Sequence, residues 1–220
     1  MQEGHRQNVM NKAKHKGILL VISGFSGAGK GTLMKALLEK YDNYALSISA
    51  TTRKPREGEV HGREYFFMSV DEFEALIAND QLIEHAKYVS NYYGTPRSYV
   101  EEKMAEGKDV ILEIEIQGAL KVKEKFPETL LIFVVPPSAE ELKKRLIGRG
   151  TETMEVIEQR MNRATEEAEA MDAYDYILVN DDLNKAVESL HNLIQSQHMQ
   201  ARCNAELIKT MKEELAAIVG

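Results

Sequence analysis

The sequence predicts an α/β fold: a parallel β-sheet with helices on both faces, an inserted mixed α/β module and a helical lid. Three observations lead to this prediction. Apolar runs such as ILLVIS (18–23) and LLIFVV (130–135) are typical of strands that are buried on both faces. Segments with the helical spacing of apolar residues alternate with these runs, as they do in parallel sheets. Residues 50–100 break the alternation and begin with a stretch rich in charge, glycine and proline, which indicates a separate module.

The elements of the core follow from the apolar runs and from helix-start signals. Ser138 with Glu141 has the spacing of a capping box, and Asp182 is placed to open the last core helix. In chain order, the expected core elements are strand 18–23, helix 29–41, strand 45–49, strand 109–115, helix 118–125, strand 130–135, a charged helical segment, strand 175–180 and a helix from residue 182.

The remaining segments surround this core. In the module, Ser69 with Glu72 predicts a capped helix, and residues 80–96 are expected to form irregular strands and turns. An apolar stripe on the last helix is expected to pack on the chain's own domain, with a subunit contact as the alternative. The expected boundaries are 1–16 for a flexible leader, 17–49 and 101–197 for the core, about 138–171 for the lid within it, 50–100 for the module and 198–220 for a helical tail.

The composition restricts the classes of partner. The chain has 220 residues, of which 43% are hydrophobic and 29% charged, which suits one sizeable domain with inserts. Its net charge of −7 argues against a broad surface for nucleic acid. Cys203 is the single cysteine, which excludes an intrachain disulfide and fits a cytoplasmic location. The apolar runs are too short to span a bilayer, so no membrane association is expected.

The stretch GFSGAGKGT (24–32) lies between the first expected strand and the first expected helix. Gly24-x-x-x-x-Gly29-Lys30 is the phosphate-binding-loop (P-loop) pattern, in which backbone N–H groups and a helix N-terminus surround phosphate oxygens. Lys30 adds a positive charge for the β- and γ-phosphates of a nucleotide. The pattern usually continues with Ser or Thr, which contacts Mg²⁺. Here Gly31 follows, and Thr32 carries the hydroxyl one position later, so Thr32 is the candidate metal ligand.

The module carries groups that suit a second anionic substrate. Arg53 and Arg56 are three residues apart in TTRKPREG, and Tyr65, Tyr93 and Thr95 follow. Guanidinium groups and tyrosine hydroxyls are good donors to a phosphate dianion. This feature distinguishes the chain from P-loop proteins that only hydrolyse a nucleotide.

Several stretches together resemble the guanylate kinase family, in order from about Gly17 to Ile194. They are GFSGAGKGT, SATTRKPREGEVHGREYFF, IEHAKYVSNYYGTP, ILEIEIQGA, KKRLIGRGTET and VNDDL. The resemblance implies a P-loop nucleoside monophosphate kinase that transfers the γ-phosphate of ATP to GMP, or dGMP, with Mg²⁺ as cofactor. The implied ATP-binding residues are Gly24, Ser26, Gly27, Ala28, Gly29, Lys30, Gly31, Thr32 and Asn180, and the implied GMP-binding residues are Ser49, Arg53, Arg56, Tyr65, Glu84, Tyr93, Thr95 and Glu115.

The acidic residues have distinct implied roles. A carboxylate at Glu84 can accept from both N1 and N2 of guanine, a pair of donors that adenine lacks. Glu113 and Glu115 are two residues apart, so they are expected on one side of a strand, at its carboxyl end. The family usually has Asp at the second position, where this chain has the longer Glu115.

The charged segment 138–171 resembles the family's lid, which closes over ATP. The resemblance implies that Arg145, Arg149 and Arg160 approach the transferred phosphoryl group, which with Lys30 and Arg53 makes the expected catalytic set. Arg163 is expected on the solvent-facing side of a lid helix.

Two other readings of the sequence remain open. Non-catalytic guanylate kinase-like modules bind protein ligands, but they characteristically lose the P-loop that is intact here. A kinase for another mononucleotide is the third reading, which Glu84 disfavours. The expected partners are therefore ATP and GMP or dGMP, with a homo-oligomer among the options.

Overall fold

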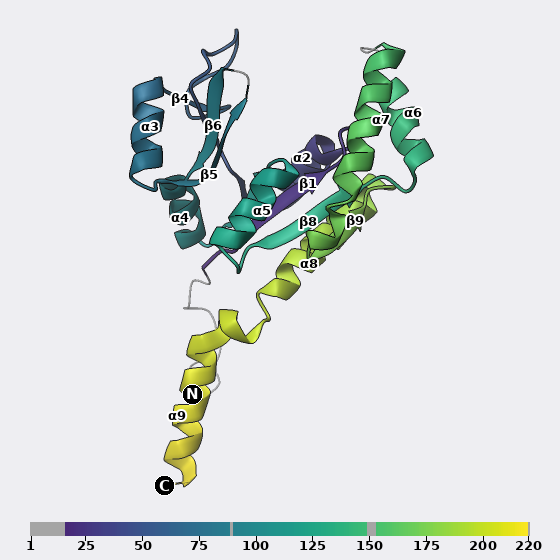
Figure 1. Ribbon diagram of the computed structural model, residues 1–220. Coiled ribbons are helices and arrows are strands. Elements are labelled where there is room, and N and C mark those ends of the chain that lie inside the picture. Colours follow the sequence, from purple (N-terminus) through teal and green to yellow (C-terminus); the bar gives the residue numbers. More distant parts are fainter. Residues whose placement is uncertain (1–15, 89, 149–152, 220) are drawn as a thin grey trace.

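A parallel sheet forms the centre of the molecule, in agreement with the predicted fold class. The computed structural model describes residues 16–88, 90–148 and 153–219 (Figure 1). Five parallel strands lie in the order β2-β7-β1-β8-β9. Their bounds are β1 Leu19–Gly24, β2 Tyr44–Leu46, β7 Asp109–Glu113, β8 Leu130–Val135 and β9 Tyr176–Val179.

Helices cover both faces of this sheet. Leu20 and Ile22 of β1 pack on one face with α2 (Lys30–Lys40) and α8 (Leu183–Gln197). Val21 packs on the other face with α4 (Arg97–Ala105) and α5 (Ile116–Lys125). Side chains of a strand alternate between the two faces, so a central strand covered on both must be apolar throughout. This requirement explains the continuous apolar run of β1.

A second, four-stranded sheet lies within the module, in the order β4-β3-β6-β5. The strands are β3 Ala50–Thr51, β4 Phe66–Phe67, β5 Leu82–Tyr88 and β6 Asn91–Pro96, and helix α3 spans Val70–Ala78. The predicted capping box between Ser69 and Glu72 is confirmed. The prediction of irregular strands and turns over 80–96 is confirmed, because β5 and β6 form an antiparallel pair with one register shift.

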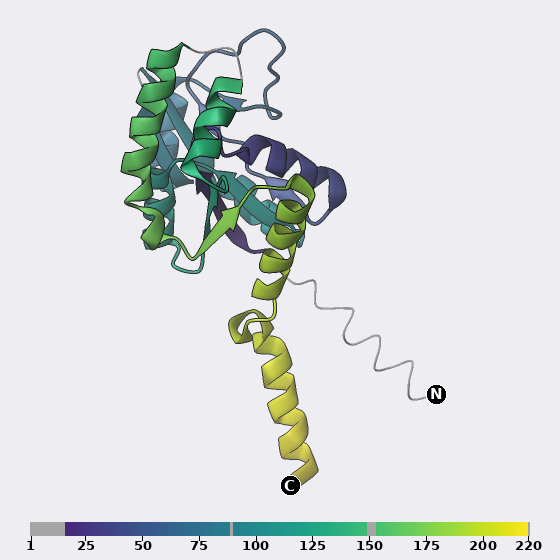
Figure 2. The same cartoon turned by 90° about the vertical axis from the view of Figure 1, so that its right-hand side faces the viewer.

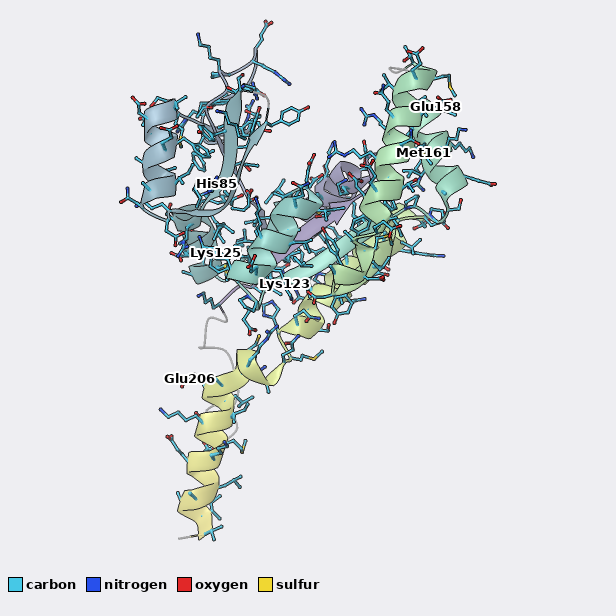
Figure 3. All side chains as sticks on the ribbon, viewed as in Figure 1. His85, Lys123, Lys125, Glu158, Met161 and Glu206 are labelled. Carbon is cyan, nitrogen blue, oxygen red and sulfur yellow. The ribbon has the colours of Figure 1, made fainter. Side chains whose placement is uncertain are left out.

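The module also contacts the core through α5. Lys125 at the end of α5 donates to the carbonyl oxygen of Leu82 at 3.2 Å and pairs with Asp80. Figure 3 shows Lys125 on the side of α5 that faces β5, the strand that carries His85. These contacts hold the second sheet beside the first.

Two antiparallel helices, α6 (Ala139–Gly148) and α7 (Met154–Ala168), form the lid segment. Leu142 and Leu146 of α6 pack with Ile157 and Ala164 of α7, and Met161 joins them from the face of α7 that meets α6 (Figure 3). The module and this helix pair stand on opposite sides of the central sheet (Figure 1). A short 3₁₀ turn, η1 Met171–Ala173, leads into β9.

The tail leaves the domain. After η2 (Ala201–Asn204), helix α9 (Ala205–Val219) points away from both sheets (Figures 1 and 2). No residue of α9 is buried, and Leu215 and Ile218 are 55% and 80% exposed. The expectation that this apolar stripe packs on its own domain is therefore wrong. Helical spacing predicted the stripe correctly but carries no information about what covers it.

A contact between a half-buried histidine and a buried aspartate fastens the start of the tail. His198 at the end of α8 lies 2.9 Å from the Asp109 carboxylate, which also accepts from the backbone N–H of Ile18. The hydrogen bond to Asp109 raises the pKa of His198. Among the described helices, none is long and apolar enough to cross a membrane.

Candidate active site

The loop between β1 and α2 has the backbone geometry that a phosphate requires. Gly29 adopts φ +88° and ends the loop, and no side chain caps the helix that follows. The first turn of a helix has N–H groups without intrahelical acceptors, and its dipole favours an anion. Lys30 Nζ donates to the carbonyl oxygens of Gly24 (2.7 Å) and Phe25 (3.2 Å), so the lysine curls over its own loop. The loop can thus surround an anion with donors.

Neighbouring segments enclose the loop tightly. A Cβ added to Gly24 would lie 2.2 Å from the carbonyl oxygen of Val134, and one added to Gly29 would lie 2.6 Å from Asn180 Nδ2. Both positions also have positive φ. Glycine is therefore required there by the packing as well as by the turn.

The lid helices contribute arginines to this loop. Arg160 of α7 donates from Nη1 to the hydroxyl of Ser26. Arg145 of α6 donates from Nη1 to the carbonyl oxygen of Asn180 (2.9 Å) and from Nε to Glu141 (2.9 Å). Two of the predicted lid arginines thus lie at the loop or its neighbour. Arg149, the third, lies outside the described residues.

A cavity of about 720 Å³ lies between the P-loop, the end of β7 and α7. Its lining includes the positive groups Lys30, Arg160 and Arg163 and the carboxylates Glu113, Glu115 and Glu167. Tyr88 of β5 also lines it, so the module reaches the same space. The cavity can therefore receive a triphosphate end next to a group presented by the module.

The two acids do not share the strand in which they were expected. β7 ends at Glu113, and Glu115 is the residue that precedes α5. The prediction that the two residues share one face of a strand is therefore wrong, although both side chains line the cavity. Glu115 pairs with Arg163 of the lid at 2.9 Å. The chain bends after Glu113 because α5 must begin its return across the sheet, and a two-residue spacing cannot reveal such an end.

The module gathers predicted anion-binding residues from distant parts of the sequence. The Arg53 guanidinium lies over the Tyr65 ring (5.3 Å to its centre), and the Tyr65 and Tyr93 rings are 6.1 Å apart. Glu59 pairs with Arg53 at 2.8 Å and accepts from the backbone N–H of Arg56 at 2.7 Å. The hydrogen bond from Arg53 lowers the pKa of Glu59, so this carboxylate stays ionised and keeps the arginine in place.

Three other predicted residues have clear positions. Thr95 is fully buried on β6 and donates to Glu84 of β5 at 2.8 Å. Burial raises the pKa of Glu84, and the hydrogen bond from Thr95 and the charge of Lys121 oppose this shift. Ser49 comes directly before β3, and its carbonyl oxygen accepts from the N–H of Phe66.

Sequence reasoning missed Glu59, Tyr88 and the identity of the partners of Arg163, for which a salt-bridged surface position was expected. Glu59 lies inside the stretch TTRKPREGE, so its acidic character next to two arginines was the available signal. Tyr88 precedes the turn between β5 and β6, which was not expected as a hairpin. Arg163 is 56% exposed, as expected of a solvent-facing position, yet it pairs with Glu115 and with Glu167.

The parallel sheet, the glycine loop at its carboxyl edge and the lysine at the helix start define a P-loop nucleotide-binding protein. The module and the lid arginines further define the class as one that presents a second substrate to the nucleotide. Thr32, the predicted metal ligand, lies exposed on the first turn of α2, and the described residues contain no cluster of three or more His, Cys, Asp or Glu that could hold a metal.

Comparisons with known proteins identify the family. The guanylate kinase family model matches residues 16–197. The chain is 51% identical to the guanylate kinase of Oceanobacillus iheyensis over 201 residues, which is 91% of this chain and 98% of the relative. It is 51% identical to that of Bacillus subtilis over the same shares of both chains. The crystal structure of guanylate kinase from Anaplasma phagocytophilum matches with a TM-score of 0.64 and 34% identity, over 86% of this chain and 89% of that one.

The chain therefore belongs to the guanylate kinase family, which confirms the resemblance seen in its motifs. It is an enzyme of the nucleoside monophosphate kinase class.

Proposed function

We propose that this chain transfers the γ-phosphoryl group of ATP to GMP or dGMP, which gives ADP and GDP or dGDP. The observation that carries the proposal is the shared cavity, in which the P-loop lysine, a lid arginine and a tyrosine of the module meet. A nucleotide hydrolase would need only the first of these. The names of the relatives, all guanylate kinases, support the choice of acceptor.

The ATP side of the proposal rests on the main chain. The amides from Gly24 to Thr32 and the Lys30 ammonium bind the triphosphate, with Ser26, Gly27, Ala28, Gly29 and Gly31 shaping the loop. The segment at Asn180 borders the adenine. Lys30 Nζ donates to the carbonyl oxygens of Gly24 and Phe25, so the side chain is long enough to contact a phosphate bound inside the loop.

The GMP side rests on side chains. Arg53, Arg56, Tyr65 and Tyr93 donate to the GMP phosphate, and the ring contacts around Arg53 support their convergence. Ser49 adds a hydroxyl at the edge of the same sheet. Glu84, oriented by Thr95, accepts from the guanine N–H groups. Adenine lacks this pair of N–H groups, so it would leave the half-buried carboxylate with Thr95 alone as a donor, which is the physical basis of selectivity. Glu115 lies at the cavity between the two sites.

Phosphoryl transfer needs positioning and charge stabilisation more than acid–base chemistry. Lys30, Arg53, Arg145, Arg149 and Arg160 supply the positive charge around the transferred group in this proposal. Closure of α6 and α7 excludes water, which would otherwise accept the phosphoryl group. The contact of Arg160 with Ser26 supports this assignment, because it already brings α7 to the loop.

Mg²⁺ is the proposed cofactor. A magnesium ion at such a site is held mainly by phosphates and water, with one or two oxygens from the protein. The Thr32 hydroxyl and the Glu113 carboxylate are suitable oxygen donors, which fits the absence of a dedicated acidic cluster in the described residues. Bound with ATP, the ion would neutralise charge on the β- and γ-phosphates.

The proposal is tested by coupled ADP-release assays with GMP, dGMP, AMP, UMP and no acceptor. We expect turnover with GMP and dGMP only. Turnover with AMP but not GMP would reject the guanine assignment. A folded protein that turns over none of them would instead favour the protein-binding reading of this fold.

Location and assembly are part of the proposal. The single cysteine supports a cytoplasmic location. The exposed stripe of α9 supports a homo-oligomer, in which these side chains leave water. Sedimentation of the full chain and of Leu215→Glu tests the assembly, because the proposed oligomer should dissociate in the variant, and a wild type that is monomeric at micromolar concentration would contradict it.

A further inference from the structure

Asn180 follows the last strand of the central sheet and makes three polar contacts from one buried position. It is only 6% exposed. Its backbone N–H donates to the carbonyl oxygen of Val135 at 2.8 Å, which extends the pairing of β8 and β9. Its side-chain Nδ2 donates to the carbonyl oxygen of Ala28 at 2.8 Å, and its own carbonyl oxygen accepts from Arg145 at 2.9 Å.

The side-chain contact falls on the turn of the P-loop. Ala28 is fully buried, and its N–H donates to the carbonyl oxygen of Phe25 at 3.0 Å. The peptide that joins Ala28 to Gly29 therefore has its carbonyl fixed by Asn180 and its N–H directed the opposite way. A peptide group is planar, so fixing the oxygen also fixes the direction of the Gly29 N–H. That N–H belongs to the group of amides that face a bound phosphate.

The residue type matches this task. The amide of asparagine supplies a neutral donor to a buried carbonyl. Aspartate would bring an acceptor against an acceptor, and alanine would leave the carbonyl of Ala28 buried without a partner.

The main-chain contact ties a second catalytic element to the same residue. Arg145 is held between the carbonyl oxygen of Asn180 and the carboxylate of Glu141, both at 2.9 Å. Substitution of the Asn180 side chain leaves this contact in place, because it uses a backbone atom. The effect of the side chain on the loop can thus be measured separately.

We propose that Asn180 is a positioning residue, whose side-chain amide sets the conformation of the P-loop through the carbonyl of Ala28 before any nucleotide binds. Only the kinetic part of this inference rests on the proposed function. The loop conformation itself is a property of the protein without nucleotide.

Hydrogen exchange of the nucleotide-free protein tests the inference. In Asn180→Ala and Asn180→Asp, we expect exchange of the amides in 24–33 to accelerate roughly tenfold or more, because the loop loses its outer anchor. Exchange over 70–78, in α3, should stay unchanged and reports that the variant is folded. Asn192→Asp, an exposed change of the same kind on α8, is the matched control and should leave both segments unchanged.

Kinetics complete the test. Both variants should lose roughly ten- to a hundredfold in kcat/KM for ATP, while KM for GMP stays within about twofold. A raised KM for ATP with unchanged exchange in 24–33 would overturn the inference and assign the side chain to direct nucleotide contact. Unchanged exchange and unchanged kinetics would overturn it as well. Asn180→Asp is nearly isosteric, so it carries the test if the alanine variant fails to fold.

The proposed function and the proposed role of Asn180 can be rejected independently of each other. A wild type without turnover for any acceptor would reject the proposed function, and the exchange measurement would still decide the role of Asn180.

Discussion

The proposed ATP side and the proposed GMP side of this molecule are built in different ways. On the ATP side, a short loop is held by contacts to its main chain, such as the one from the Asn180 side chain to the Ala28 carbonyl, and by the return of Lys30 onto its own loop. On the GMP side, Arg53 contacts Glu59 and the Tyr65 ring, which lies beside Tyr93, and Glu84 pairs with Thr95, all through side chains. The first site depends on backbone shape and the second on residue identity.

This difference predicts how each side responds to substitution. Where backbone N–H groups bind the ligand, substitution of a single side chain has little effect, except at Lys30 and at Asn180. Where side chains bind the ligand, each single substitution removes a contact. We therefore expect single substitutions to separate the two nucleotides, which would sharpen the comparison. Substitutions that weaken the binding of both nucleotides equally would contradict the comparison.

The largest effect is expected for Lys30→Ala. Removing a preorganised positive charge at the transferred group should lower kcat by roughly 10²–10³-fold or more, with KM for GMP little changed. Steady-state assays check this, with thermal melting to show that the fold persists. Lys35→Ala is the matched control, because Lys35 is an exposed lysine of the same helix that pairs only loosely with Glu39. Near-normal turnover in K30A would contradict the role of the loop.

A somewhat smaller effect is expected for Arg53→Ala. Loss of a charge-assisted donor to the GMP phosphate should lower kcat/KM for GMP roughly 10- to 100-fold, with KM for ATP within about threefold. Arg63→Ala provides the control, since Arg63 is an exposed arginine of the same module. Equal losses for ATP and GMP would indicate that the variant damages the whole module.

The third prediction concerns Glu84→Gln, which should weaken the binding of GMP by about 1–3 kcal/mol and leave the binding of ATP unchanged. Isothermal titration of each nucleotide measures this difference. Glu124→Gln on the exposed side of α5 serves as the comparison variant and should change neither affinity. Equal losses of both nucleotides would point to a structural role for Glu84.

The same variant should stabilise the protein without nucleotide at neutral pH. Burial raises the pKa of Glu84, so the ionised form destabilises the fold above the shifted pKa. Below the ordinary pKa of glutamate, the side chain is protonated in both the folded and unfolded states and the penalty is absent. Thermal melting should therefore show E84Q more stable than wild type at pH 7, with the gap closing toward pH 4. A gap that persists at pH 4 would contradict the assignment to burial.

The sequence predicted the two sides unequally, for the same physical reason. The P-loop is local, because the seven consecutive residues Gly24 to Lys30, at the join of a strand and a helix, contain both glycines of the pattern and the lysine. The central strands were equally accessible, because burial on both faces demands an apolar run. The GMP side required the family resemblance, since nothing in the separate sequence positions of Arg53, Tyr65 and Tyr93 shows that they lie together.

Other features lay beyond the sequence because they depend on long-range packing. Irregular strands were predicted over 80–96, but the antiparallel pairing of β5 with β6 was not, because polar and aromatic residues there remove the usual alternation. Glu115 was placed in a strand that ends two residues earlier. Asn180 was assigned to the adenine side, and its contact with a loop 152 positions away in the chain could not be foreseen.

The central claim is that two nucleotides bind together, one in the main-chain loop and the other in the side-chain cage. Titration of GMP into the protein saturated with a non-hydrolysable ATP analogue tests it most directly. The account predicts one GMP per chain with affinity undiminished by the analogue, lost in R53A and retained in K30A. Displacement of the analogue by GMP, or loss of GMP binding in both variants, would contradict it.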